Sequence, residues 1–141
     1  MNDIDHFCSS KTYIFKHSMQ QNLATKSIRP FIGCNDYAES IAFYKAIGFH
    51  VTSVATNMSV CQLGNCSFYL QDSQVKDWID NTMLFLEVND PEGFLTYLKS
   101  LDLKKQFPAV KLNDIVEHEW GKEFFLHDPS NILWHIGSFK E

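Results

Sequence analysis

Histidine is the residue type in this chain best suited to proton transfer or metal binding near neutral pH, and six are present. Three have no spacing that would fix them relative to one another: His6, His17 and His127. His50 follows the expected end of a helix and is predicted to lie at the surface. His118 stands between Glu117 and Glu119, in a charged stretch that we expect to be a solvated loop. His135 differs from these because it falls inside a strand pattern rich in aromatic residues.

Four cysteines could supply thiolate chemistry: Cys8, Cys34, Cys61 and Cys66. No two of them form a CxxC pair, so neither a zinc site nor a thioredoxin-type motif is predicted. A hairpin turn at Gly64-Asn65 would pair Leu63 with Cys66 and leave Cys61 out of register with it. We therefore expect reduced, partly buried thiols. The sequence also has no nucleophile elbow and no glycine-rich phosphate loop, so no catalytic residue is assigned.

Composition excludes several classes of partner. The net charge of −5 gives no electrostatic support for nucleic-acid binding. No apolar run is long enough to span a bilayer, and the first residues have neither the basic nor the apolar region of a secretory signal. We therefore expect a cytoplasmic protein without a membrane partner. Its 141 residues, 45% of them hydrophobic, are enough for one domain with a substantial core.

The residues with the most chemical interest lie in a C-terminal stretch, Trp120 to Gly137. Large side chains alternate with a period of two on both sides of an Asp-Pro-Ser-Asn turn, a pattern typical of a β-hairpin. Both faces carry apolar groups, so one face should pack on a helix. The other face carries Phe125, His127 and His135, and its contacts should decide the function.

The first half of the chain predicts a strand, a helix and three more strands. The first strand covers residues 28–34. Asp36 then caps a helix, Glu39 completes a capping-box pattern, and Gly48 ends the helix at the C′ position. The helix has an apolar stripe formed by Ile41, Phe43, Tyr44 and Ile47. The next strands are predicted at residues 49–56, 58–63 and 67–71.

The same order repeats after a linker, residues 72–81, that we expect to contain one helical turn. A strand at 82–88 precedes a helix with Asp90 at the N-cap and Pro91 at the first helical position. Its buried stripe is Phe94, Leu95, Leu98 and Leu101. Residues 103–118 must hold an extended strand and a loop, and the hairpin supplies two further strands. The prediction is an α+β domain at residues 28–138, with two βαβββ modules (about 28–71 and 82–138) after an N-terminal arm, residues 1–27.

Three blocks of residues resemble the vicinal oxygen chelate superfamily, which includes glyoxalase I, extradiol dioxygenases, fosfomycin resistance enzymes and bleomycin resistance proteins. The blocks are Asp36-Tyr37-Ala38-Glu39-Ser40-Ile41-Ala42-Phe43-Tyr44 with Gly48-Phe49, then Glu87-Val88-Asn89-Asp90, then Trp120-Gly121-Lys122-Glu123-Phe124 with Asp128-Pro129 and Trp134-His135. The Trp-Gly and Glu-Phe pairs look most like the bleomycin-resistance branch. One departure is Asn131, which stands where the family usually has glycine, although asparagine tolerates positive φ better than most residues.

The resemblance implies that each module curls into half of a glyoxalase-like cup, and that metal-dependent members place four ligands on strands facing that cup. Those positions fall here at Arg29, Tyr69, Met83 and His135. Arg29 is a permanent cation, Met83 suits soft Cu(I), and Tyr69 is a weak ligand, with Gln71 two residues away as its only substitute. Only His135 is a usual divalent ligand, so we expect no metal and no other cofactor.

A cup without a metal would suit an apolar or planar ligand that carries an anionic or hydrogen-bonding group. The candidate lining residues are Arg29, Phe31, Tyr69, Met83, Phe85, Trp120, Phe125 and His135. The resemblance to the bleomycin-resistance branch implies that Trp120 stacks on flat heterocycles of the ligand. The matching second aromatic residue would follow Gly48-Phe49, where this chain has Thr52 and Ser53.

Three functions remain open. The first is metal-independent binding of a small planar or aromatic molecule, in a cup at the homodimer interface that the resemblance implies, extending to drug sequestration and antibiotic resistance. The second is a metal-dependent lyase or thiol transferase of the glyoxalase or fosfomycin-resistance type, which needs further ligands such as Gln71 and His127 beside His135. The third is a non-catalytic interaction protein whose cup is filled by side chains. The sequence favours the first and does not name the ligand.

Overall fold

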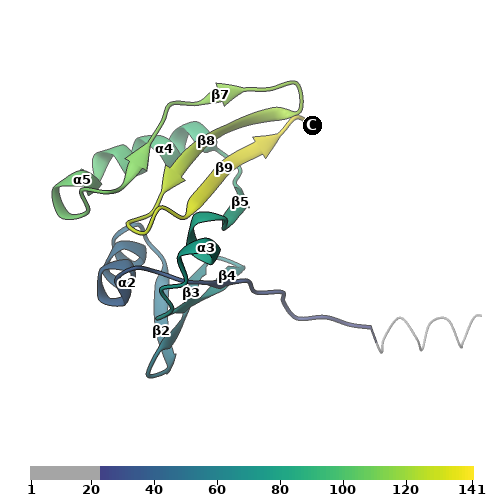
Figure 1. The fold of residues 1–141 in the computed structure, drawn as a ribbon. Coiled ribbons are helices and arrows are strands. Elements are labelled where there is room, and N and C mark those ends of the chain that lie inside the picture. The colour runs from purple at the N-terminus through teal and green to yellow at the C-terminus, as the bar shows by residue number, and fades with distance from the viewer. Residues whose placement is uncertain (1–22) are drawn as a thin grey trace, which may run out of the picture.

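The computed structural model describes residues 23–141. The elements are β1 (Phe31–Ile32), α2 (Tyr37–Ala46), β2 (His50–Ala55), β3 (Met58–Leu63), β4 (Cys66–Gln71), α3 (Lys76–Asp80), β5 (Met83–Glu87), α4 (Pro91–Ser100), α5 (Leu103–Gln106), β6 (Lys111–Leu112), β7 (Val116–Glu117), β8 (Gly121–His127) and β9 (Leu133–Phe139). Most of the expected N-terminal arm, residues 1–22, lies outside the described residues. Residues 23–30 form an extended segment that projects from the first sheet and is joined to β4 at Arg29 and Pro30 (Figure 1).

Two sheets of mixed strand direction form the fold, as the α+β prediction requires. The first sheet has the order β1-β4-β3-β2, and the second has the order β5-β9-β8-β6 with β7 also paired to β8. In each sheet the first and last strands of the module pair in parallel, with Phe31 opposite Tyr69 and Phe85 opposite His135. Helix α2 packs on the first sheet and α4 on the second, while α3 lies in the connection between them (Figure 1).

Local signals in the sequence place both long helices. Asp36 Oδ1 accepts from the Glu39 amide at 3.0 Å, and Asp90 Oδ1 accepts from the Gly93 amide at 3.0 Å, which satisfies free N–H groups at each helix start. Gly48 has φ of 110°, and its amide and that of Phe49 bond to the carbonyls of Lys45 and Tyr44. This pair of bonds is a Schellman motif, so the helix ends where the glycine permits a left-handed residue.

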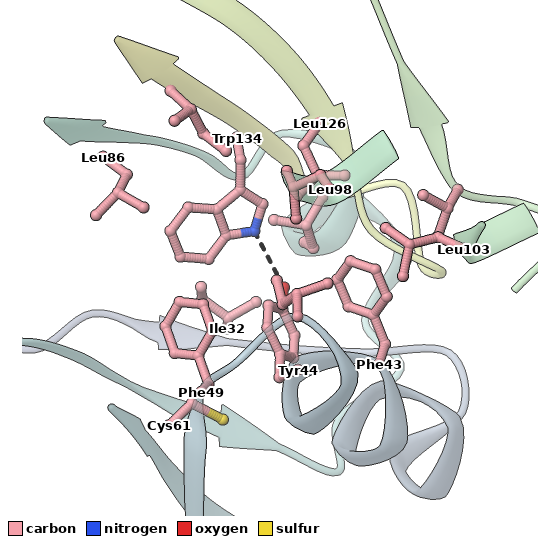
Figure 2. Packing of buried hydrophobic residues seen from close by; sticks show 14 of the residues in the cluster. Ile32, Phe43, Tyr44, Phe49, Cys61, Leu86, Leu98, Leu103, Leu126 and Trp134 are labelled. Carbon is pink, nitrogen blue, oxygen red and sulfur yellow. Dashed lines mark hydrogen bonds between the residues drawn. The ribbon is translucent and has the colours of Figure 1, made fainter. Parts of the chain in front are cut away.

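One hydrophobic core joins the two modules. Phe43 and Tyr44 of α2 are fully buried, and Phe43 packs edge-on against Phe107 of the second module at 5.4 Å between ring centroids. The indole N–H of Trp134 donates to the Tyr44 hydroxyl at 3.0 Å (Figure 2). These contacts join α2 of the first module to the second module. Phe68 of β4 also packs on Trp134 of β9 at 5.4 Å between ring centroids, so these side chains lie on the inner faces of the two sheets. No helix from residue 23 onward is long and apolar enough to cross a membrane.

Two of the predicted elements are wrong in extent. The first strand pairs only at Phe31 and Ile32 rather than over residues 28–34, and Pro30, which has no N–H to donate, stands just before it. Residues 103–118 begin with the short helix α5 instead of an extended strand. The strand that follows is split into β6 and β7, because the Asn113 side chain between them accepts from the Phe125 amide in place of a backbone carbonyl.

Candidate ligand-binding site

His135 lies between two aromatic rings on the outer face of the second sheet. Phe85, His135 and Phe125 stand directly opposite one another on β5, β9 and β8, so their side chains share that face. The Phe125 ring meets the imidazole edge-on, at 4.9 Å and 87°, whereas Phe85 lies nearly parallel to it at 6.4 Å and 20°. The imidazole is therefore held in one orientation by its neighbours.

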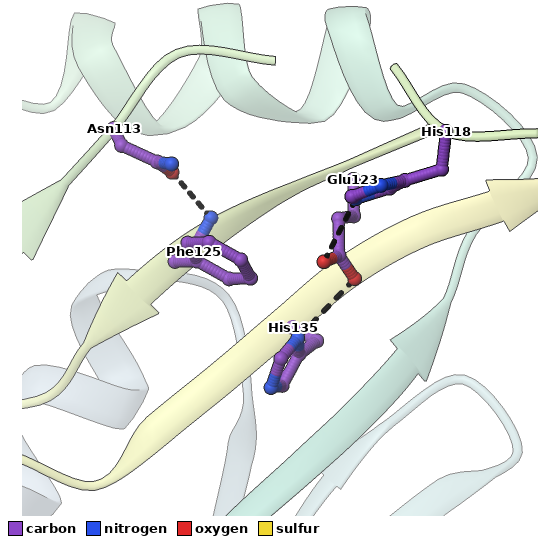
Figure 3. Close-up of polar contacts among 5 residues, drawn as sticks. All are labelled: Asn113, His118, Glu123, Phe125 and His135. Carbon is purple, nitrogen blue, oxygen red and sulfur yellow. Dashed lines mark hydrogen bonds and ion pairs between the residues drawn. The ribbon is translucent and has the colours of Figure 1, made fainter. Parts of the chain in front are cut away.

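Glu123 connects His135 to a second histidine. Glu123 is 6% exposed, and its Oε2 lies 3.2 Å from His135 Nδ1 while its Oε1 lies 3.3 Å from His118 Nε2 (Figure 3). Glu123 stands opposite Gly137 in the sheet, and a Cβ at Gly137 would approach the Glu123 Cβ to 2.9 Å. The absence of a side chain at Gly137 therefore gives Glu123 the room it occupies.

Beside this histidine pair lies an aromatic platform formed by Phe85, Trp120 and Phe139. Their ring centroids are 5.9 Å (Phe85–Trp120), 5.4 Å (Phe85–Phe139) and 5.2 Å (Trp120–Phe139) apart. The three residues are 42%, 39% and 53% exposed in the same order. Trp120 also stacks on His118 at 4.8 Å and 13°. The platform is thus an apolar surface open to solvent with polar imidazole groups at its border.

A second group lies on the outer face of the first sheet. Arg29 donates to the Ser67 hydroxyl at 2.8 Å and to the Tyr69 hydroxyl at 3.3 Å, and its guanidinium stands over the Tyr69 ring. The Phe31 ring stacks on the Tyr69 ring, at 4.8 Å between centroids and 25° between planes. These contacts bring the guanidinium and two rings into one flat, cationic surface.

A groove of about 580 Å³ runs between the two modules. Its walls include Pro30, Ser67, Phe68, Met83, Phe85 and Trp134. The volume is in the usual range for small-molecule sites. The groove reaches Ser67, the partner of Arg29, at one side and Phe85 of the aromatic platform at the other. Met83, 68% exposed, belongs to this groove.

Seven of the eight predicted lining residues fall into two groups, and the eighth, Met83, lines the groove. One contains Phe85, Trp120, Phe125 and His135, and the other contains Arg29, Phe31 and Tyr69. Within residues 23–141 no hydrogen bond or ring contact joins the groups. The prediction missed Glu123, His118 and Phe139. The alternation His135, Gly137, Phe139 along β9 was the signal for Phe139, and the same alternation from Phe125 to Glu123 was the signal for the carboxylate.

The expected solvated loop at residues 117–119 is wrong for His118. Glu117 and Glu119 are exposed, but His118 is partly buried because it contacts both Trp120 and Glu123. Sequence spacing gave no indication of this, because the contacts depend on how β7 pairs with β8.

Thiol chemistry has no support among the described cysteines. Burial raises the pKa of the Cys34 thiol to about 11 and that of the Cys61 thiol to about 12, so both stay protonated and unreactive. Cys66 is exposed rather than partly buried, although it pairs with Leu63 as predicted. Cys8 lies outside the described residues.

The four positions that would hold a metal in this fold do not form a donor set. The Tyr69 hydroxyl accepts a hydrogen bond from the Arg29 guanidinium, and both oxygens of the Glu123 carboxylate contact imidazole nitrogens. In residues 23–141 no group of three His, Cys, Asp or Glu side chains is arranged to bind a metal ion. A divalent ion would meet a permanent positive charge at Arg29, so the residues present do not fit it.

No family model matches this chain, and no curated protein matches it. Several solved structures are similar. A bleomycin-binding protein complexed with bleomycin has a TM-score of 0.70 at 18% identity, over 82% of this chain and 100% of that one. An antibiotic-binding protein from Streptomyces sp. CB03234 has a TM-score of 0.66 at 14% identity, over 83% and 98%. A lactoylglutathione lyase from Agrobacterium tumefaciens has 0.61 at 12%, over 81% and 94%.

These similarities show that the chain has the fold of the vicinal oxygen chelate (glyoxalase/bleomycin resistance) superfamily, as the resemblance implied. Both binding proteins and a lyase adopt this fold, so the fold by itself does not choose between binding and catalysis.

Proposed function

We propose that this protein binds a small planar aromatic molecule without a metal ion and acts by sequestering it. The observation that carries the proposal is the aromatic platform, in which three mutually packed rings remain between 39% and 53% exposed. Contiguous apolar surface of this kind usually marks a binding site. Flat rings such as Trp120 and Phe85 stack on planar ligands at a low cost in conformational entropy.

The similar solved structures also support a role in binding small molecules. One was solved with bleomycin bound and another is an antibiotic-binding protein, so this fold serves for drug binding in proteins of similar shape. Drug sequestration leading to antibiotic resistance is the role we assign on that basis. The competing lyase or transferase function requires a metal, and the residues at the four positions do not fit one.

The complete cup is proposed to form between two copies of this chain. The Arg29 group and the aromatic platform lie on different sheets and do not touch within one chain, so a second copy would bring one group opposite the other. The extended segment at residues 23–30 carries Leu23 and Ile28, which are 73% and 95% exposed. Burying these side chains against a partner would remove their apolar surface from water, which would stabilise a homodimer.

A thermal-shift screen of planar aromatic antibiotics tests the binding site. A true ligand at a hundredfold excess over its dissociation constant should stabilise the parent by about 2.7 kcal/mol. Trp120→Ala should abolish most of that shift. Trp78→Ala is the matched control, because Trp78 is 67% exposed on α3, away from the platform. A shift that survives in Trp120→Ala, or a screen in which no planar compound stabilises the protein, would contradict the proposal.

A further inference from the structure

We infer that His135, oriented by Glu123, accepts a hydrogen bond from a hydroxyl group on the ligand's ring, so the preferred ligands are hydroxylated planar aromatics. This inference rests on the proposed function and names the ligand class of the same site. It is carried by the Glu123–His135 contact, by the free side of the imidazole and by the aromatic rings around it.

The carboxylate fixes which nitrogen of His135 carries the proton. Glu123 is almost fully buried, and its Oε2 lies 3.2 Å from Nδ1. An ionised carboxylate can only accept, so in the neutral ring Nδ1 is the donor and Nε2 is left as an acceptor. The other carboxylate oxygen is taken by His118 at 3.3 Å, so Glu123 cannot rotate away without losing that second contact.

The acceptor nitrogen is free and points away from Glu123. Figure 3 shows the second ring nitrogen of His135 on the side opposite the carboxylate. No described residue bonds to this Nε2. The side chain is 25% exposed, so a ligand atom can reach it. A buried acceptor covered by a ligand that cannot donate would lose its bond to water, and this penalty gives the site its selectivity.

The surrounding rings set the ligand's shape. Phe85 belongs to the aromatic platform and also lies nearly parallel to the His135 ring. A flat ligand stacked on the platform therefore has its edge beside His135, where a ring hydroxyl can donate to Nε2. A carboxylate at the same place has no proton to donate to Nε2 and would leave this acceptor unpaired. Glu87 and Glu123 also flank Gly137 in the adjacent row of the sheet. The unpaired acceptor and the nearby negative charges both favour a hydroxyl group over an acid.

Three matched probes test the ligand class by calorimetric titration: 2-naphthol, 2-methoxynaphthalene and 2-naphthoate. They share one ring system and differ in the group presented to His135. The parent should bind 2-naphthol about tenfold more tightly than the methyl ether, as expected for one hydrogen bond to a buried acceptor. The naphthoate should bind more weakly than 2-naphthol. In His135→Phe the preference for 2-naphthol over the ether should fall to near unity, because the ring stays and the acceptor is lost.

The control is His127→Gln, on the same strand face and outside both residue groups, which should keep the parent's preference. Equal binding of 2-naphthol and its ether by the parent would overturn the hydroxyl assignment while leaving planar binding intact. Failure of all three probes to bind would overturn this inference, whereas the proposed function would be overturned only if the thermal-shift screen also found no planar ligand.

A measurement without ligand tests the orientation of His135 separately. The ¹⁵N spectrum of the neutral ring should show Nδ1 protonated and Nε2 bare in the parent. Glu123→Gln should convert this to a mixture of tautomers, since an amide can also donate to Nδ1. A parent spectrum with the proton on Nε2 would overturn the inference even if the probes bind.

Discussion

At the scale of single residues, the most unusual group is Asp128 in the turn of the hairpin. It is fully buried and accepts three bonds, from the Tyr44 hydroxyl at 2.7 Å and from the amides of Ser130 and Ile132 at 2.8 and 2.9 Å. Burial nonetheless outweighs these bonds and raises the pKa of Asp128 to about 6. The carboxyl group that holds the turn therefore keeps its proton to a higher pH in the folded protein than in the unfolded chain.

The pH dependence of stability follows from that shift. The folded pKa lies above the unfolded value, so this group's contribution to stability is complete below about pH 4 and is lost as the pH rises towards 6. We expect the unfolding free energy of the parent, relative to Asp128→Asn, to fall by about 2–3 kcal/mol between pH 4 and 7. Urea unfolding of both proteins across this range measures it. A difference that stays constant with pH would show that Asp128 titrates normally.

Only some of the residues of the candidate site could be predicted from the sequence. His135 and Trp120 could be singled out because a strand pattern and a Trp-Gly pair mark them. Alternation along the strand placed Glu123 on the same face, but the roles of Glu123 and His118 could not be predicted, because they come from one carboxylate lying between two imidazoles across strands. Such a contact depends on the register of β7, β8 and β9, which side-chain alternation does not fix for so short a strand as β7.

At the scale of elements, capping and turn residues predicted boundaries well wherever a side chain enforces them. Asp36, Asp90 and Gly48 stand at the predicted helix ends. The segment at residues 103–118 was predicted poorly, because a four-residue helix leaves little periodicity and Asn113 interrupts the strand after it. Local patterns therefore fixed the long elements, and tertiary contacts decided the short ones.

The hairpin turn offers a test of backbone strain. Asn131 has φ of 71° and is exposed, and its amide bonds to the Asp128 carbonyl at 2.9 Å. Asn131→Ala should destabilise the protein by about 1 kcal/mol, because alanine tolerates this conformation poorly. Asn131→Gly should match the parent or exceed it slightly, since glycine adopts positive φ without strain. Denaturant midpoints of the three proteins give the order. An alanine variant as stable as the glycine variant would show that the turn is not strained.

At the scale of the whole molecule, two modules and a shared core could be predicted from the repeat in the chain. The sequence could not predict whether the Arg29 group contacts the aromatic platform, because within one chain these groups lie on different sheets. In the proposed two-chain cup, contact between these groups would depend on how copies of the chain assemble, and the sequence patterns of a single chain carry little information about assembly.

Assembly can be measured by sedimentation equilibrium. The protein should sediment at twice its chain mass of 16.3 kDa. Ile28→Asp should shift it towards the monomer, because Ile28 is 95% exposed in one chain and would be buried against the partner. Val54→Asp is a suitable comparison, since Val54 is 50% exposed on β2, away from the extended segment. A parent that sediments as a monomer would remove the two-chain cup.

Titration calorimetry with and without a chelator tests whether ligand binding needs a metal ion. The ligand found in the thermal-shift screen is titrated into the protein in the presence of EDTA and again without it. We expect the same dissociation constant in both titrations, with about one ligand per chain. A dissociation constant that rises more than about tenfold in EDTA, and recovers when a divalent metal is added back, would contradict it.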